Sequence, residues 1–189
     1  MNPIFAAALE LHQFCSRRAW SFCFIGGIAV QRWGEPRLTE DADLTLLTGF
    51  GDEEPFVDEL LAAFSPRRPD AREFALRYRV LLLSSRNGVP LDVSLGAMPF
   101  EQRAVERATP FEIGEGHTVL TCSAEDLVVF KAFAGRDKDW LDIEGIALRQ
   151  AGRLREELVW EELGPLLELK ESPETAQRLR AVLERARPD

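Results

Sequence analysis

Three aspartates have the types and spacing of a divalent-metal site. Asp41 and Asp43 lie two residues apart where polar and apolar residues alternate, so both side chains leave one face of a predicted strand. Two carboxylates held this close repel each other unless a cation lies between them, although both could simply face solvent at the start of a strand. Asp92 stands between Leu91 and Val93, where a charge needs solvent or a partner. If the two strands pair, three acids converge and suit two metal ions about 4 Å apart.

A glycine pair upstream of these acids could bind phosphate. Gly26 and Gly27 follow a short apolar segment and open a predicted helix, where backbone N–H groups and the helix N-terminus favour an anion. The alternative is a tight strand-to-helix turn that needs glycine only for its geometry. The 13 residues between Gly27 and Asp41 (28–40) leave room for one helix and a return. Phosphate and metal held side by side would indicate nucleotide chemistry.

Other polar residues are candidates for supporting roles. Arg37 could contact a triphosphate or form a surface salt bridge. Thr39 is better explained by local backbone hydrogen bonding than by substrate contact. Lys131 lies in an unusually apolar segment, from which it could reach phosphate or extend to solvent. Asp139 and Asp142, three residues apart on one predicted helix, could orient Lys131 or the acceptor, or be solvated acids near a helix start.

The pattern of apolar residues predicts the elements that must position these groups. Helices are predicted at 4–18, 28–33, 56–64 and 100–107, and strands at 21–25, 41–47, 73–84, 89–95 and 118–121. Asn87-Gly88 between two apolar runs predicts a hairpin. Helices follow at 127–134, 140–150 and 157–168, with a last one opening at Ser172-Pro173. We therefore expect an α+β (α/β mixed) fold, with a small mixed sheet and its helices at 1–110 and a mainly helical region packed on it at 111–189.

Composition restricts the function classes. A net charge of −9 argues against a general nucleic-acid coat protein, although residues 66–107 carry eight arginines against five acids and could contact an anionic substrate. No apolar run reaches membrane-spanning length and no signal peptide is evident, so we expect a cytoplasmic protein that does not bind membranes. Cys15, Cys23 and Cys122 are scattered and are expected to be buried free thiols rather than zinc ligands.

Taken in order, these motifs resemble the DNA polymerase β-like nucleotidyltransferase superfamily. The shared signature is a glycine turn, a helix, an Asp-x-Asp strand and a later strand acid, here Gly26-Gly27, Asp41-Ala42-Asp43 and Asp92. The segment from Gly26 to Leu44, with Trp33-Gly34, Arg37 and Thr39, more closely resembles the AbiEii-type toxin nucleotidyltransferase group. Glu125-Asp126-Leu127, Lys131 and Arg136 to Ile143 extend the likeness over roughly residues 22–145. One departure is Gly27, where a serine often stands.

The resemblance implies a Mg²⁺-dependent enzyme that moves a nucleoside monophosphate from an NTP such as ATP to an acceptor hydroxyl. It implies two ions, with Mn²⁺ as an alternative, held by Asp41, Asp43 and Asp92, which together with Lys131 and Asp139 are the expected catalytic residues. Gly26, Gly27, Arg37, Thr39 and Lys131 are the expected nucleotide contacts. The acceptor implied is RNA, a tRNA end, with a cognate antitoxin as partner. Two alternatives are transfer to a small molecule such as an antibiotic, and a non-catalytic binding or antitoxin module.

Overall fold

The computed structural model describes residues 1–187, which form two compact units. The first unit comprises Met1–Ile28 and Leu38–Cys122, and the second comprises Ala29–Arg37 and the chain from Ser123 onward. The first unit includes a hairpin at residues 109–121, beyond the residue-110 boundary of the predicted core. The second unit includes a short insert from the N-terminal half of the chain, which carries Arg37.

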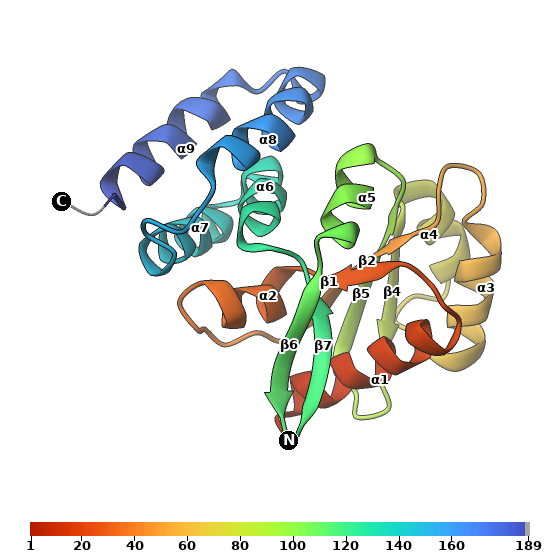
Figure 1. The fold of residues 1–189 in the computed structure, drawn as a ribbon. Helices are drawn as coiled ribbons and strands as arrows, with labels where there is room; N and C mark the ends of the chain where they lie inside the picture. Colours follow the sequence, from red (N-terminus) through yellow and green to blue (C-terminus); the bar gives the residue numbers. More distant parts are fainter. Residues whose placement is uncertain (188–189) are drawn as a thin grey trace. The chain divides into compact units, whose positions relative to one another are not determined.

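A single mixed sheet forms the centre of the first unit (Figure 1). Its strand order is β3-β4-β5-β2-β1-β7-β6, and the β2/β5 and β1/β7 pairs are parallel while the others are antiparallel. The strands are β1 Phe22–Phe24, β2 Ala42–Leu47, β3 Ser65–Pro66, β4 Val80–Ser84, β5 Pro90–Gly96, β6 Thr109–Gly114 and β7 His117–Thr121. The predicted mixed α/β fold is confirmed.

The apolar alternation of the central strands separates a core face from a polar face. In β2, Ala42 and Leu44 are buried in the hydrophobic core, so Asp43 between them points to the other face. In β5, Leu91 and Val93 belong to the same core and place Asp92 opposite it. Both acids therefore lie on the face of the sheet that turns away from the core.

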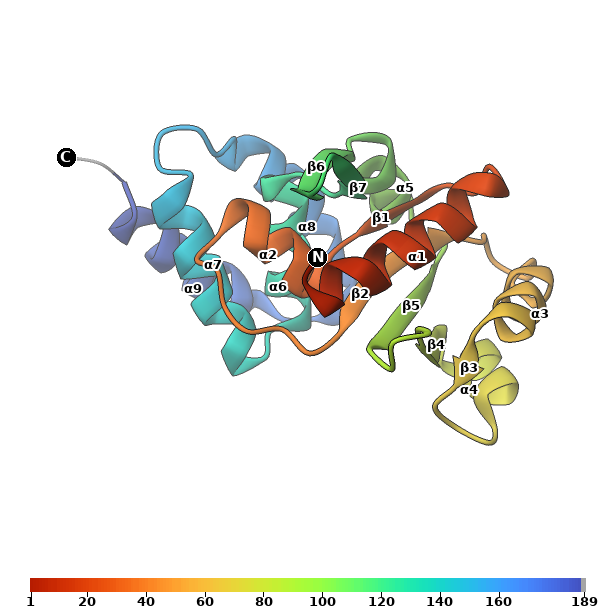
Figure 2. The same ribbon diagram turned by 90° about the horizontal axis from the view of Figure 1, so that it is seen from below.

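Helices cover the core face of the sheet. They are α1 Pro3–Arg17, α3 Glu54–Ala63 and α4 Ala71–Tyr78, while α5 Pro99–Glu106 contacts β1 and β2. In α1 the Asn2 side chain accepts a hydrogen bond from the Ile4 N–H at 2.9 Å, Pro3 opens the first turn, and Ala7, Ala8, Leu11, Phe14 and Cys15 are buried. Figure 2 shows α1 lying along the sheet and α3 beside α4 at the β3–β4 edge.

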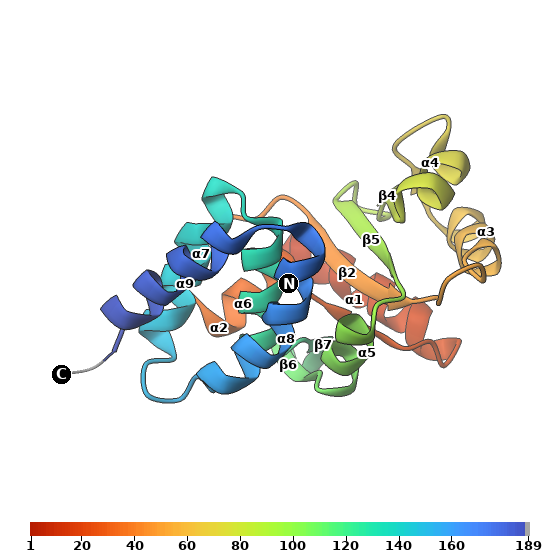
Figure 3. The same cartoon turned by 90° about the horizontal axis from the view of Figure 1, so that it is seen from above.

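The second unit is helical within the described residues. It holds most of α2 (Gly26–Trp33, which begins in the first unit), α6 Ala124–Ala134, α7 Asp137–Arg149, α8 Glu156–Lys170 and α9 Pro173–Arg185 (Figure 3). The predicted cap of α6 is present: the Ser123 hydroxyl accepts a hydrogen bond from the Asp126 N–H at 3.1 Å. Gly135, with a φ of 69°, ends α6 in the left-handed conformation.

The structure corrects the predicted strand at 73–84 and adds two strands that were not predicted, the two-residue β3 and β6. Residues 71–78 are helical, and Arg79 ends α4 with a φ of 58° before β4 begins at Val80. The Arg79 side chain donates to the Leu95 carbonyl at 2.6 and 2.9 Å. Strand β6 was missed because it is a largely exposed edge strand containing Pro110. The hairpin at Asn87-Gly88 is confirmed, with a Gly88 φ of 81°.

The three cysteines are buried free thiols, as predicted. Burial raises the pKa of the Cys15 thiol to about 12, against the smaller opposing effect of Arg18. Over the described part of the chain, no helix combines the length and the apolar character that crossing a membrane requires.

Candidate active site

The structure brings together the three acids singled out by their spacing. Asp43 on β2 and Asp92 on β5 are direct neighbours in the parallel pairing, and Asp41 stands just before β2. One carboxylate oxygen from each residue lies within 4.8 Å of the other two, and all three residues are partly exposed. Three carboxylates at this separation and exposure can share a cation that arrives from solvent.

The glycine turn packs directly against this acid cluster. The Ile25 N–H donates to the Asp43 carbonyl at 3.0 Å, which leads Gly26 past the Asp43 side chain. Gly26 has a φ of 55°, and a Cβ atom there would lie 2.6 Å from the Asp43 Cγ. Glycine is therefore required at this position both for its backbone conformation and for its lack of a side chain.

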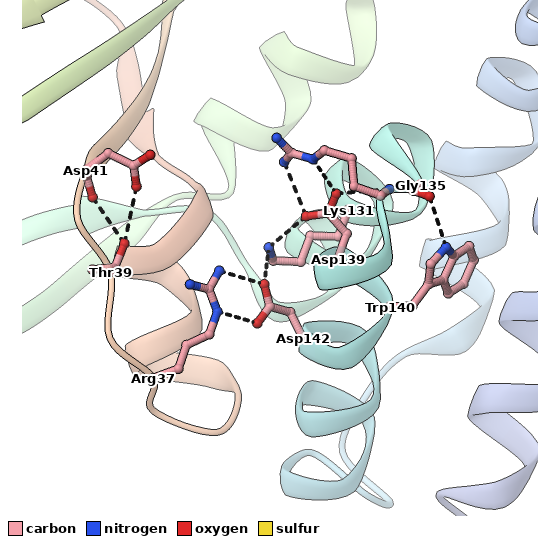
Figure 4. A network of polar contacts seen from close by, with 9 residues as sticks. Arg37, Thr39, Asp41, Lys131, Gly135, Asp139, Trp140 and Asp142 are labelled. Carbon is pink, nitrogen blue, oxygen red and sulfur yellow. Dashed lines mark hydrogen bonds and ion pairs between the residues drawn. The ribbon is translucent and has the colours of Figure 1, made fainter.

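Gly27 fits against Thr39 in the same way. A Cβ atom at Gly27 would lie 2.7 Å from the Thr39 Cβ, so the threonine side chain fills the space that a residue-27 side chain would need. The Thr39 hydroxyl also makes hydrogen bonds to Asp41, 3.3 Å from both its carbonyl oxygen and its Oδ1 (Figure 4). Thr39 thus makes the predicted local hydrogen bonds, and it links the glycine turn to the first acid.

An arginine that the sequence did not single out joins the cluster. The Arg67 guanidinium donates a hydrogen bond to Asp92 and forms an ion pair with it. Arg67 follows β3, and its backbone N–H donates to the Leu82 carbonyl at 3.0 Å. Leu82 is in turn the cross-strand neighbour of Asp92. The arginine-rich composition of residues 66–107 was the one available signal, but no spacing connects Arg67 to Asp92.

In the second unit Lys131 is buried and paired with acids. The residue is 5% exposed, and its Nζ donates to Asp142 Oδ2 at 2.6 Å and to Asp139 Oδ1 at 3.3 Å (Figure 4). The alternative in which Lys131 extends to solvent is therefore wrong. Its predicted contact with phosphate stays a prediction, and the predicted pairing with Asp139 and Asp142 is present.

Arg37 forms a two-pronged salt bridge with Asp142. Its Nε donates to Asp142 Oδ1 at 2.7 Å, and its Nη2 donates to Oδ2 at 2.9 Å. The Gln31 side chain also donates to the Arg37 carbonyl at 2.6 Å. Asp142 is 5% exposed whereas the Arg37 side chain is 38% exposed, so a buried acid fixes a cation that reaches the surface of its unit. The proposed triphosphate contact of Arg37 is untested by this geometry.

Cations hold the two buried acids of this network in their charged form. Burial acts to raise the pKa of Asp142, but hydrogen bonds from Arg37 and Lys131 together outweigh it and keep this pKa below its ordinary value. Burial also acts to raise the pKa of Asp139, but Arg136 and Lys131 together outweigh this effect and lower that pKa. Arg136 Nε donates to Asp139 Oδ2 at 2.7 Å. Both acids are therefore ionised at neutral pH.

The donor set of the first cluster fits a hard divalent cation. Asp41, Asp43 and Asp92 offer only carboxylate oxygens, which suit Mg²⁺ or Mn²⁺ better than zinc. Gly26 and Gly27 also form the first turn of α2, and the N-terminus of a helix favours an anion such as phosphate. In the described residues this is also the one group of three or more potential metal ligands close enough to share an ion.

The fold and this cluster together define a nucleotidyltransferase. The structure resembles that of an antigenic nucleotidyltransferase-like protein from Paracoccidioides brasiliensis, with a TM-score of 0.51 and 18% identity over 94% of this chain and 92% of that one. The family model of the nucleotidyl transferase AbiEii toxin, of type IV toxin–antitoxin systems, matches residues 15–159. This is more than half of the chain, which therefore belongs to the AbiEii nucleotidyltransferase toxin family.

Two further solved structures are similar at lower scores. One is the antibiotic-resistance factor ANT(2'')-Ia, with a TM-score of 0.49 and 16% identity over 94% of this chain and 95% of that one. The other is the lincosamide antibiotic adenylyltransferase LnuA in a lincomycin-bound crystal structure, with a TM-score of 0.49 and 11% identity over 75% of this chain and 94% of that one. Comparison with curated protein sequences gives no match.

Proposed function

We propose that this protein transfers a nucleoside monophosphate from an NTP to an acceptor hydroxyl, with release of pyrophosphate, in a reaction that depends on Mg²⁺ or Mn²⁺. The observation that carries the proposal is the convergence of Asp41, Asp43 and Asp92 beside the Gly26 turn on the polar face of the sheet. Such a cluster costs energy through like-charge repulsion, and a structural role would not require it.

The residues of the first unit divide the work as follows. The backbone of Gly26 and Gly27 approaches the phosphates of the nucleotide, and Thr39 holds that turn against Asp41. The acceptor oxygen attacks the α-phosphorus, the bond from that phosphorus to the bridging oxygen breaks, and pyrophosphate leaves. Asp92 accepts the proton of the acceptor hydroxyl. Bound divalent ions would be held by the three aspartates and would supply positive charge that stabilises the transferring phosphoryl group.

The remaining predicted site residues belong to the second unit. There Lys131, Asp139 and Asp142 form one buried ion-pair network with Arg37. We propose that this network fixes the orientation of Arg37, which keeps its predicted role as the cation for the triphosphate. In that role Asp142 is a positioning residue, and Lys131 and Asp139 support it.

We further propose RNA, such as a tRNA end, as the acceptor and a cognate antitoxin as the partner, because the chain belongs to a toxin family of toxin–antitoxin systems. This would place the protein in the cytoplasm. The arginines of the 66–107 segment give this idea little support: Arg68, Arg72, Arg79 and Arg86 are each paired with a carboxylate of the first unit. A net charge of −9 is equally compatible with a small acceptor, which is therefore an arm of the test.

The test is a labelling assay with the purified chain. Each α-labelled NTP is incubated with Mg²⁺ and either total tRNA or a panel of small hydroxyl compounds that includes antibiotics. Label on RNA supports the full proposal, and label only on a small compound replaces the acceptor but keeps the reaction. No transfer and no NTP binding would support the non-catalytic alternative.

The matched variants are Asp43→Asn and Asp52→Asn, which remove the same charge from different places. Asp52 is exposed in the loop after β2, outside the acid cluster. We expect D43N to abolish transfer and D52N to retain it. Equal activity of the two variants would remove the acid cluster from the reaction.

A further inference from the structure

A cation supplied by the protein itself contributes to the charge balance of the acid cluster. The three carboxylates have oxygens within 4.8 Å of one another, and the Arg67 guanidinium is paired with one of them, Asp92. Arg67 thus neutralises part of the charge that would attract a metal ion.

Strand pairing places Arg67 beside Asp92. The Arg67 backbone is hydrogen bonded to Leu82, Leu82 faces Asp92 across the β4/β5 pair, and Asp92 faces Asp43 across the β5/β2 pair. Arg67 therefore stands at one end of a row that crosses the polar face of the sheet. Gly26 packs against Asp43 at the other end of that row. Arg67 is thus on the side of Asp92 that is opposite to the glycine turn.

Neighbouring arginines do not share this arrangement. Arg68 pairs with Asp70, and Arg72 pairs with Glu54 and Asp58, all outside the cluster. Arg67 is therefore distinguished from these two neighbours in the described structure by a partner that belongs to the predicted metal site.

We propose that Arg67 is a counter-cation that competes with a divalent ion for Asp92 and so sets the metal affinity of the site. This inference rests on the proposed function, because it assumes that the acid cluster binds metal. The side chains of Arg67 and Asp92 are 31% and 30% exposed, so solvent screens their attraction and a doubly charged ion can displace the guanidinium. Displacement leaves Arg67 beside the cluster, on the side away from the phosphate-binding turn.

The experiment is a titration of the full chain with Mn²⁺ alone, in which the free ion is followed by electron paramagnetic resonance. Removing one positive charge at a partly screened site should tighten binding by roughly three- to tenfold in Arg67→Gln. Arg68→Gln removes the same charge from the next residue and should change the dissociation constant by less than about twofold. Unchanged or weaker binding in R67Q would overturn the proposal.

A double-variant comparison separates direct competition from a general effect of charge. In the Asp92→Asn background the partner of Arg67 has lost its charge, so adding R67Q should alter Mn²⁺ affinity by less than about twofold. If R67Q tightens binding equally in both backgrounds, Arg67 acts at long range and does not compete for Asp92. Arg67→Lys retains the charge and should stay within about twofold of the wild type, and circular dichroism confirms that each variant is folded.

The same titration distinguishes failure of this inference from failure of the proposed function. If the wild type binds no Mn²⁺, or if D43N binds it as well as the wild type, the metal-dependent reaction is wrong and this inference falls with it. If the wild type binds Mn²⁺, D43N does not, and R67Q matches the wild type, only the role of Arg67 is refuted.

Discussion

The two units treat groups of acidic side chains in opposite ways. In the second unit Asp139 and Asp142 are buried, and Lys131, Arg37 and Arg136 supply hydrogen bonds and positive charge from within the same unit. In the first unit the Asp41, Asp43 and Asp92 carboxylates are partly exposed and crowded together, and the ion pair that Arg67 makes there is also partly exposed. The buried arrangement of the second unit suits a fixed structural role. The exposed arrangement of the first unit suits the reversible binding of an ion.

This difference indicates how carboxylates can be sorted into structural and functional sets. An acid that is buried with matched cations is already neutralised, and removing a partner leaves an uncompensated charge that destabilises the fold. An acid held near like charges at the surface destabilises the fold slightly and is retained for what it binds. Substitutions in the exposed cluster should therefore leave stability nearly unchanged, whereas substitutions in the buried network should reduce it.

The largest expected effect is on activity in the first unit. Asp43→Asn should lower the rate of nucleotidyl transfer at least about 10³-fold, because it removes a central ligand of the proposed metal site. Its free energy of unfolding should stay within about 0.5 kcal/mol of the wild type or rise, since one source of repulsion is lost. Parallel rate assays and urea denaturation check both values. A stability loss of several kcal/mol would show that Asp43 is structural.

Lys131→Met should lose stability, which Asp43→Asn should not. It leaves two buried carboxylates without a central cation, so we expect a loss of about 3–5 kcal/mol in the free energy of unfolding. Lys138→Met is the matched control, because Lys138 is exposed on α7, and it should change stability by no more than about 0.5 kcal/mol. Urea denaturation at pH 7 measures both variants. The comparison between the units fails if K131M is as stable as K138M.

The sequence predicted the acid cluster better than its surroundings. The i, i+2 spacing of Asp41 and Asp43 and the apolar neighbours of Asp92 fix the face on which each side chain lies, since strand alternation is a local property. Arg67 escaped prediction because its contact with Asp92 depends on the order of β3, β4 and β5, which local spacing does not encode. Helix α4 was merged with β4 because the left-handed break at Arg79 has no glycine or proline to mark it.

The second unit shows the same limit. The apolar neighbours of Lys131 indicated an unusual lysine, and the spacing of Asp139 and Asp142 indicated a common helix face. That Arg37 closes this network could not be derived from spacing, because residues 29–37 reach the second unit from a distant part of the chain. Long-range pairing of a short insert is set by tertiary packing rather than by local pattern.

A substitution in the glycine turn of the first unit should have an effect of intermediate size on activity. Gly27→Ala places a Cβ atom 2.7 Å from the Thr39 Cβ, so the turn or Thr39 must shift, and activity should fall about 10- to 100-fold. In the Thr39→Gly background the obstructing side chain is absent. There Gly27→Ala should lower the transfer rate by a smaller factor than it does in the wild type. Single-turnover transfer rates measure both factors. If Gly27→Ala lowers the rate by the same factor in both backgrounds, the contact between residues 27 and 39 does not limit activity.

The smallest expected effect is on the dependence of stability on pH. Because the pKa values of Asp139 and Asp142 are lower in the folded state, the unfolded chain binds protons at these groups first as the pH falls. Their contribution to stability is therefore complete above the unfolded pKa of about 3.9 and is lost as the pH falls through the lowered folded values. Urea denaturation between pH 7 and pH 3 should show this loss in the wild type and a shallower one in K131M, in which less cationic charge holds the two acids ionised. Equal slopes for the two proteins would mean that the buried network contributes nothing to acid sensitivity, and the contrast between a neutralised and an ion-binding acid group would have no thermodynamic basis.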